Sequence, residues 1–285
     1  MIKGLLNINK PKGYTSQDVV SVARKALSTR DIGHMGTLDP QGEGVLILGV
    51  GKATRLFDFM LKKDKTYRAE FQFGYETDTL DADGKVIDET NSIPSQKEIE
   101  EKITSFIGKQ NQLPPKYSAK NVNGKRAYDL ARSGIDFELK TSEIEIYDLR
   151  IIEKTGKNKY LFEINCSGGT YVRSVCRDLA YSLNSLATMT SIFRTKCGKF
   201  TFETSITLEE LKEKKTDAII PLDEVFSNVN RYDVGETLYT KLSNGIKIHV
   251  DNVVREPFVV YCKNELFGLG KIEEGFLKIK TYLRD

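Results

Sequence analysis

Tryptophan is absent from the 285 residues, and histidine occurs only at His34 and His249. Two histidines cannot build a histidine-rich metal cluster, and a Ser-His-Asp catalytic triad would have to use one of them. The four cysteines lie far apart and include no C-x-x-C pair. This pattern favours a reducing compartment, the cytoplasm, over a secreted domain held together by disulfides.

Long apolar runs are also missing. Runs such as residues 45–48 are far shorter than a membrane span, and the first residues lack the apolar stretch of a signal peptide. Hydrophobic residues nevertheless make up 39% of the chain and charged residues 29%, which predicts an ordered protein with a sizeable core. We therefore expect a soluble cytoplasmic protein with one large domain and a small second one.

The formal net charge of +3 is distributed unevenly along the chain. Residues 1–69 carry a net charge of +6, residues 70–108 carry −7, and residues 109–132 carry +5. Two basic blocks around an acidic one indicate a polyanion that meets part of the surface. Ordinary solvated charge is the alternative interpretation.

Helices and strands can be predicted from caps and periodicity. A Ser or Thr followed three positions later by an acidic residue, and then by a helical period, predicts helices that begin after Thr15, Ser95 and Thr207. Alternation of apolar and polar residues predicts a half-buried strand over 67–73. Segment 109–134 is rich in turn signals and basic residues, which predicts an exposed loop with one short helix.

The last sixty residues have a different pattern. Short apolar segments at 246–250, 258–262, 266–271 and 276–283 predict a small β-rich domain over 226–285, after a catalytic domain over 1–225.

The least ordinary stretch is the glycine-rich loop 33–44. Its four glycines permit unusual backbone conformations, and Pro40 biases Asp39 toward an extended conformation. A lone carboxylate on such a loop is a candidate nucleophile or base. The alternative is that Asp39 only caps a turn.

Four motifs then occur in the order that one family uses: NKPKGYTS at 9–16, GHMGTLDP at 33–40, KTYRA at 65–69 and CSGGTYVRS at 166–174. Together they resemble the TruB family, the stand-alone tRNA pseudouridine-55 synthases. The resemblance covers essentially the whole chain, and residues 226–285 are similar to a reduced PUA RNA-binding module. It implies an α/β (α+β) pseudouridine synthase fold, with a central mixed, largely antiparallel sheet and a PUA-like second domain.

The resemblance also implies the chemistry. Asp39 matches the catalytic aspartate, which attacks either C6 of uracil or C1′ of the ribose in uridine 55 of the T arm. The freed base turns and rejoins the sugar through C5, so substrate and product are isomers and neither cofactor nor metal is implied. Tyr67 matches the tyrosine that stacks on the base and helps to remove the C5 proton. Arg173 matches the arginine that pairs with the aspartate and keeps it ionised. Without the motifs, a core tyrosine and a solvated surface arginine are the plainer interpretations.

The remaining matches concern substrate contacts. The resemblance implies binding of the flipped nucleotide by His34, Tyr171 and Ile192. It also places Lys10 among the substrate-binding residues, as structural support near the cleft. The basic segment corresponds to an insertion that clamps the RNA stem-loop, through Lys116, Lys120, Lys125 and Arg126. Two positions depart from the family pattern: Gly42 replaces an alanine, and Phe193 replaces the first arginine of a Leu-Arg-Arg run.

Two alternatives stay open. One is the RNA-guided pseudouridine synthase, which lacks the basic insertion and needs partner proteins. The other is a non-catalytic tRNA-folding chaperone, although Asp39 and Tyr67 are both present. We expect a monomer that binds tRNA and needs neither a membrane nor an obligate protein partner.

Overall fold

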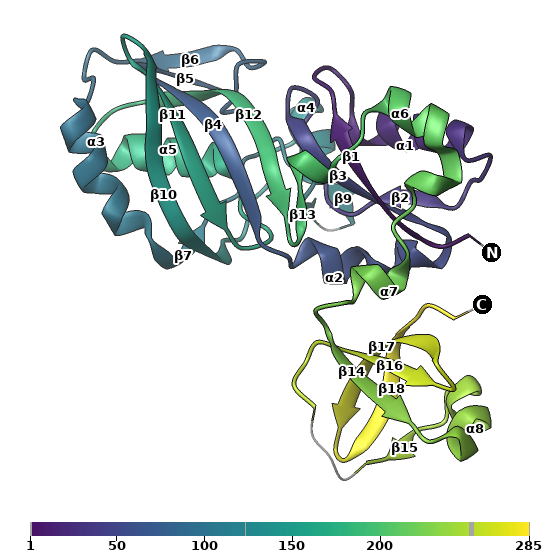
Figure 1. The fold of residues 1–285 in the computed structure, drawn as a ribbon. Coiled ribbons are helices and arrows are strands. Elements are labelled where there is room, and N and C mark those ends of the chain that lie inside the picture. Colours follow the sequence, from purple (N-terminus) through teal and green to yellow (C-terminus); the bar gives the residue numbers. More distant parts are fainter. Residues whose placement is uncertain (1, 123, 251–253, 285) are drawn as a thin grey trace.

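The computed structural model describes residues 2–122, 124–250 and 254–284. The centre of its larger part is a nine-stranded sheet in the order β1-β3-β12-β4-β11-β10-β7, with β2 paired to β3 and β13 to β12 (Figure 1). Only β12 and β3 run parallel among the described strands of this sheet, so the predicted mixed, largely antiparallel sheet is confirmed. Its strands are β1 (Gly4–Lys10), β2 (Ile32–His34), β3 (Glu43–Val50), β4 (Lys65–Phe73), β7 (Gly108–Gln112), β10 (Ser142–Gly156), β11 (Lys159–Cys166), β12 (Ala187–Cys197) and β13 (Phe200–Thr201).

Helices pack on this sheet in two groups. Helices α1 and α6 lie together at the end formed by β1, β2 and β3, whereas α3 and α5 pack against the strands at the other end (Figure 1). The helices of the larger part are α1 (Ser16–Ala26), α2 (Phe57–Leu61), α3 (Gln96–Ile103), α4 (Ala127–Arg132), α5 (Val172–Ser182), α6 (Leu208–Lys214) and α7 (Leu222–Val225). No helix in the described ranges is both long and apolar enough to cross a membrane.

The three predicted helix starts are confirmed as capping boxes. The Thr15 hydroxyl accepts a hydrogen bond from the backbone N–H of Asp18, whose carboxylate accepts one from the N–H of Thr15. The same reciprocal bonds are present at the other two starts, Ser95 with Glu98 and Thr207 with Glu210. These local bonds satisfy N–H groups that a helix leaves unpaired in its first turn.

The predicted start of the basic segment is wrong. Residues 108–112 form β7, which pairs antiparallel with β10 at the edge of the central sheet. The run from Lys109 to Gln112 is entirely polar, so no apolar alternation marked it as a strand. Only the chain after it leaves the sheet; it holds β8 (Asn121–Val122), β9 (Lys125–Arg126) and the predicted short helix α4. Residues 113–141 are called the basic insertion below.

A second sheet of five strands, in the order β14-β16-β17-β18-β15, forms the smaller part (Figure 1). It has its own apolar core, which includes Val234, Phe258 and Phe267. Its elements are β14 (Asn230–Val234), α8 (Tyr239–Ser243), β15 (Ile248–His249), β16 (Phe258–Cys262), β17 (Glu265–Glu273) and β18 (Phe276–Tyr282).

The two parts share a further apolar cluster. Val259 and Leu283 of the smaller part pack with Leu5 and Leu56 of the larger part. At the same seam, Lys3 Nζ donates to the backbone carbonyl of Leu283 at 3.0 Å. Apolar burial of this kind is the main source of stability in a folded chain, so it fixes the smaller part against the larger one.

Candidate active site

Asp39 lies in the loop between β2 and β3, and hydrogen bonds to the first residue of α1 hold this loop in place. The hydroxyl of Ser16 donates to the carbonyl of Leu38 at 3.0 Å and accepts from its N–H at 2.9 Å. The carbonyl of Asp39 itself accepts from the N–H of Gly42 at 2.9 Å, which closes a tight turn. A Cβ at Gly42 would meet the Leu38 side chain at 3.0 Å, so even the family's alanine would be tight here.

Arg173 is buried beside Asp39, not solvated on its helix. It belongs to the first turn of α5, and its side chain is only 7% exposed. One guanidinium nitrogen lies 2.9 Å from Asp39 Oδ2. Two further donors bind the carbonyls of Thr79 and Tyr117, each at 3.0 Å. The predicted pair is present, but the arginine is its buried member, since the Asp39 side chain is 39% exposed.

A second carboxylate, Asp81, completes this cluster. Its Oδ2 lies 3.1 Å from Arg173 Nη1, and its Oδ1 accepts from the hydroxyl of Thr79 at 2.6 Å. Asp81 lies in the turn between β5 (Tyr75–Thr77) and β6 (Val86–Glu89), and the turn is bonded to Met189 at the start of β12. Our sequence analysis missed Asp81, because one aspartate in an acidic turn carries no signal that it meets an arginine 92 positions later.

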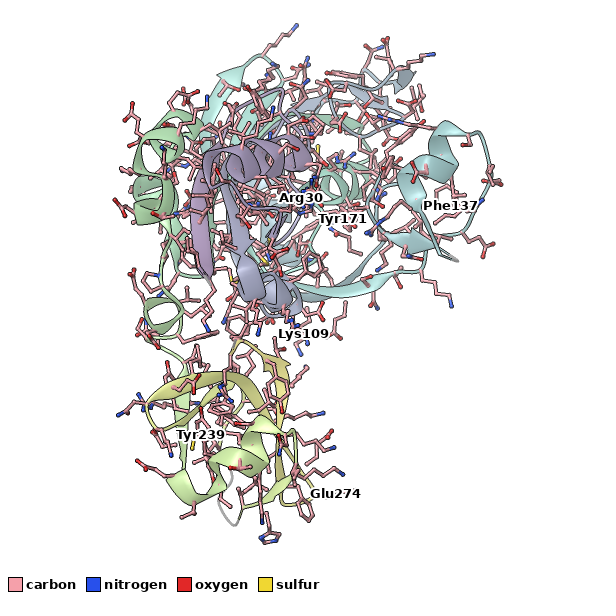
Figure 2. All side chains as sticks on the ribbon, turned by 90° about the vertical axis from the view of Figure 1, so that its right-hand side faces the viewer. Arg30, Lys109, Phe137, Tyr171, Tyr239 and Glu274 are labelled. Carbon is pink, nitrogen blue, oxygen red and sulfur yellow. The ribbon has the colours of Figure 1, made fainter. Side chains whose placement is uncertain are left out.

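These residues border a cleft of about 570 Å³. Asp39, Asp81, Arg173 and His34 line it, together with the start of α1, the end of β12 nearest Met189 and part of the basic insertion. In Figure 2 the insertion, marked by Phe137, projects from the body of the molecule on the side of Tyr171. The insertion contributes Tyr117, Ser118, Ala119, Tyr128 and Arg132 to the lining. No group of three or more His, Cys, Asp or Glu side chains within the described ranges is placed to hold a metal ion.

Two of the predicted contacts to the base are more deeply buried than the cleft lining. Tyr67 on β4 is 7% exposed and Ile192 on β12 is 8% exposed, and both belong to the main apolar core. Neither is among the residues that line the cleft. Burial raises the pKa of the Tyr67 phenol to about 12.

His34 lines the cleft, whereas Tyr171 is not among its lining residues. The Nδ1 of His34 is buried, with no hydrogen-bond partner among the residues that the structure describes. Burial, with the nearby Arg194 and Arg126, lowers the pKa of His34, so its neutral form is favoured. The backbone of Tyr171 is clamped by the side-chain amide of Gln112, which donates to its carbonyl at 3.1 Å and accepts from its N–H at 2.8 Å.

Lys10 does not reach the cleft, so our assignment of Lys10 to substrate binding is corrected. The side chain is fully buried, and Nζ donates to three backbone carbonyls, those of Pro11, Tyr14 and Pro40. The bond to Pro40, 3.1 Å long, anchors the loop immediately after Asp39. Lys10 is therefore a support for the loop, because its ammonium is used entirely by the backbone around it.

Replacing Lys10 should destabilise the protein in a pH-dependent way. Burial lowers the pKa of Lys10 from 10.5 to about 8, so between these values the unfolded chain binds a proton that the folded chain does not. Unfolding then takes up a proton, and the stability of the wild type relative to Lys10→Met rises as the pH increases from 8 to 10. Urea unfolding of both proteins across this range measures the difference. The exposed Lys12→Met is the matched control, and an equal pH trend in both variants would contradict the assignment.

The predicted phosphate ligands of the basic insertion differ in their surroundings. Lys116 and Lys125 are exposed. Lys120 is half-buried and its Nζ donates to the Ser142 hydroxyl at 2.6 Å, while Arg126 donates to the carbonyl of Ala119 at 2.7 Å. Lys120 is thus tied to β10, whereas Lys116 and Lys125 extend from the insertion.

Phe193, which replaces an arginine of the family pattern, lies away from the cleft. The Phe193 ring packs edge-on against Phe202, with the ring centroids 4.9 Å apart, and does not line the cleft. Its neighbour Arg194 is 3% exposed, and our sequence analysis did not assign it to the site. Side chains alternate between the two faces of a strand, so Phe193 and Arg194 point to opposite sides of β12.

Comparisons with known proteins identify the family of the chain. Residues 24–172 match the model of the TruB family pseudouridylate synthase (N terminal domain). The tRNA pseudouridine synthase B of Alkaliphilus oremlandii is 39% identical over 278 residues, covering 94% of this chain and 93% of that protein. Those of Clostridium tetani and Clostridioides difficile are 38% and 40% identical, and the matches cover 98% and 95% of this chain and 99% and 94% of theirs.

Solved structures of similar fold are more distant in sequence. A chain of an H/ACA ribonucleoprotein bound to a substrate RNA is 22% identical with a TM-score of 0.73, and the match covers 99% of this chain and 85% of that one. A chain of a Cbf5-Nop10-Gar1 complex is 23% identical with a TM-score of 0.74, over 98% of this chain and 84% of that one. These likenesses concern the fold, and the predicted pseudouridine synthase fold is confirmed. From the family model and the curated relatives together, the chain belongs to the TruB family of pseudouridylate synthases.

Proposed function

We propose that this protein isomerises uridine 55 in the T arm of tRNA to pseudouridine, with Asp39 as the nucleophile. One observation supports it above all others: the Asp39 carboxylate borders an open cleft and is bonded at 2.9 Å to a buried guanidinium. The guanidinium holds the carboxylate in one orientation at the cleft, as a nucleophile requires. Curated relatives named tRNA pseudouridine synthase B support the same substrate class.

Arg173 has two tasks in this proposal. It orients Asp39, and its single positive charge offsets part of the negative charge of the two carboxylates of the cleft, Asp39 and Asp81. The RNA backbone is itself anionic, so two unneutralised carboxylates would repel it. The carbonyls of Thr79 and Tyr117 hold the guanidinium in one orientation, which fixes Asp39 before the substrate arrives.

The uridine must leave its stack to reach Asp39. Extrusion of a nucleotide costs a few kcal/mol, which stacking and polar contacts in the pocket offset. The cleft offers Tyr128 and Tyr117 from the basic insertion, and His34 from β2. The Nδ1 of His34 has no hydrogen-bond partner in the described part of the chain, and we propose that it accepts a hydrogen bond from the flipped nucleotide.

The isomerisation moves one proton overall. Once C5 is bonded to C1′ and the bond between Asp39 and the substrate has broken, the electron pair of the C5–H bond forms the C5=C6 double bond. The C5 proton passes to a base, which we propose is the Tyr67 phenolate. The phenol formed in this way passes the proton on to N1, which left the sugar with the electron pair of the N1–C1′ bond. Substrate and product are therefore isomers, and no electrons enter or leave.

The two alternatives make different demands. An RNA-guided enzyme needs a guide RNA and partner proteins, whereas the relatives that match along the whole chain are named as tRNA enzymes. A chaperone without turnover requires no nucleophile, whereas this cleft presents a carboxylate that is 39% exposed. We further propose that the protein acts in the cytoplasm as a monomer.

The direct test is to incubate unmodified tRNA with the protein and to map pseudouridine by carbodiimide treatment and primer extension. We expect modification of the T-loop uridine by the protein alone, without guide RNA or added cofactor. A tRNA in which that uridine is replaced by cytidine is the matched control and should yield no signal. Modification only after a guide RNA is added would favour the RNA-guided alternative.

Neutralising the exposed lysines of the basic insertion should weaken tRNA binding and reduce its salt dependence. We expect Lys116→Gln with Lys125→Gln to lower the slope of log K against log salt by about 1 to 2, because each lost phosphate contact removes roughly 0.7 to 0.9. Lys120→Gln should have less effect, since its Nζ is bonded to Ser142. Filter binding from 50 to 300 mM salt measures the slopes.

The control for these variants is Lys97→Gln with Lys102→Gln on α3, a helix that contributes nothing to the lining of the cleft. This pair removes the same charge from the protein. If it lowers the slope as much as the insertion variants do, net charge and not the insertion governs binding.

A further inference from the structure

Arg194 lies where three strands meet. In β12 it is paired antiparallel with Tyr67 of β4 and parallel with Gly44 of β3. Gly44 has a φ of +94°, and a Cβ there would lie 2.4 Å from the carbonyl oxygen of Arg194. Only glycine lets β3 approach β12 this closely, which brings the base of the Asp39 loop next to Arg194.

The Arg194 guanidinium joins the two proposed reacting groups. Nε donates to the carbonyl of Val45 at 2.6 Å, and Nη1 lies 3.4 Å from the carbonyl of Thr37, two residues before Asp39. Tyr67 is its cross-strand partner in β4, and the positive charge of Arg194 acts on the Tyr67 phenol. Arg194 and Tyr67 are both at least nine-tenths buried, so water screens this interaction little.

The charge of Arg194 favours one form of the Tyr67 phenol. A guanidinium has donors only, so toward Arg194 the phenol oxygen can act only as an acceptor. Burial disfavours the phenolate and raises the pKa of Tyr67, while the positive charge of Arg194 acts in the opposite direction. The other titratable groups acting on Tyr67 are Cys166 of β11 and Cys197 of β12. Burial raises the pKa of Cys166 to about 11, so Arg194 is the cation that acts on the phenol at neutral pH.

We propose that Arg194 is a positioning residue for the isomerisation: it orients the Tyr67 phenol and stabilises the phenolate that takes the proton from C5. This inference rests on the proposed function, because it assigns the base of that reaction its cationic partner. Through Thr37 the same guanidinium also sets the distance between the Asp39 loop and Tyr67. Loss of Arg194 should therefore slow proton removal from C5 more than it weakens RNA binding.

The test compares rate–pH profiles of the wild type, Arg194→Gln and Arg194→Lys in single-turnover reactions with tRNA. At pH 7 we expect Arg194→Gln to react roughly 10- to 100-fold more slowly, within the usual contribution of a positioned base. The deficit should shrink as the pH rises, so that the profile moves to higher pH by about one unit. Arg194→Lys keeps a positive charge and should move the profile less.

An isotope effect provides a readout that a structural role would not change. With tRNA deuterated at C5 of uridine, Arg194→Gln should show a primary isotope effect larger than that of the wild type, because proton removal has become rate-limiting. In the Tyr67→Phe background, Arg194→Gln should add little, since the phenol on which it acts is gone. If Arg194→Gln does not fold, as judged by thermal melting, Arg194→Lys alone carries both the pH and the isotope comparison.

The failure of this inference and that of the proposed function are distinguishable. A wild type that forms no pseudouridine overturns the function itself. The role of Arg194 alone is overturned if the wild type forms product but the folded Arg194 variants are slowed by the same factor at every pH and show no larger isotope effect. Variants as fast as the wild type would overturn it equally.

Discussion

The Asp39→Asn variant should bind tRNA with nearly unchanged affinity and form no detectable pseudouridine. The amide is almost the same size as the carboxylate, and Asp39 is 39% exposed, so the fold should tolerate the change. An amide oxygen is a poor nucleophile, however, and it no longer offers a full negative charge to Arg173. Removal of a nucleophile typically lowers kcat by on the order of 10⁴-fold or more. Single-turnover product assays together with filter binding measure both halves of this expectation.

A matched control separates the effect of changing the site from the effect of losing one negative charge. Asp58→Asn removes one carboxylate from the exposed surface of α2, outside the cleft lining, and should leave rate and binding unchanged. Product from Asp39→Asn at a rate near that of the wild type would overturn the nucleophile assignment. A loss of binding equal to the loss of rate would assign Asp39 to substrate recognition instead.

Replacement of Arg173 by alanine should damage both stability and catalysis. Four acceptors surround the guanidinium, namely two carboxylates and two carbonyls. Removing one member of a buried ion pair costs about 3 to 5 kcal/mol, and we expect about 2 to 3 here because Asp39 remains partly solvated. The rate should fall by roughly 10³-fold, since Asp39 loses both its orientation and its counter-charge. Urea unfolding and single-turnover assays measure the two effects.

Arg173→Lys keeps the positive charge but not the planar guanidinium, so it tests whether the geometry of the hydrogen bonds matters beyond the charge. A lysine has three donors on one nitrogen, which cannot reach Asp39, Asp81 and two carbonyls at once. We expect this variant to regain part of the stability but to remain about 10²-fold slower. The exposed Arg150, which pairs with Glu163 on the sheet, is the control, and Arg150→Ala should cost less than about 1 kcal/mol and leave the rate unchanged. If Arg173→Ala is as stable and as fast as Arg150→Ala, the cluster has no role.

Local chemistry explains why much of the fold was predictable. The starts of α1, α3 and α6 follow from caps, which depend on residues three positions apart. The strand β4 follows from alternation, because one of its faces packs against the core. β7 escaped prediction, since it is a polar edge strand whose place in the sheet comes from pairing with β10 and not from its own apolar residues.

The candidate site was predictable only where motifs carry it. Asp39 and Arg173 lie in motifs that resemble one family, and the structure places them in contact. Asp81 and Arg194 lie outside those motifs, and each becomes part of the site through a partner at least 90 positions away along the chain. For Lys10 the motif was misleading. It led us to expect a substrate contact, whereas the side chain is buried and its ammonium hydrogen-bonds to the loop after Asp39.

The amino-acid sequence was enough to predict the helix starts and the family. It also placed the proposed nucleophile, the carboxylate before Pro40, in a glycine-rich loop. Tertiary structure alone decided which charges neutralise one another, because an ion pair depends on distance in space and sequence separation does not limit it. It also decided which polar groups line the cleft and which donate hydrogen bonds to backbone carbonyls, as Lys10 and Arg194 do. A buried donor must find an acceptor, and only the folded chain brings one within reach.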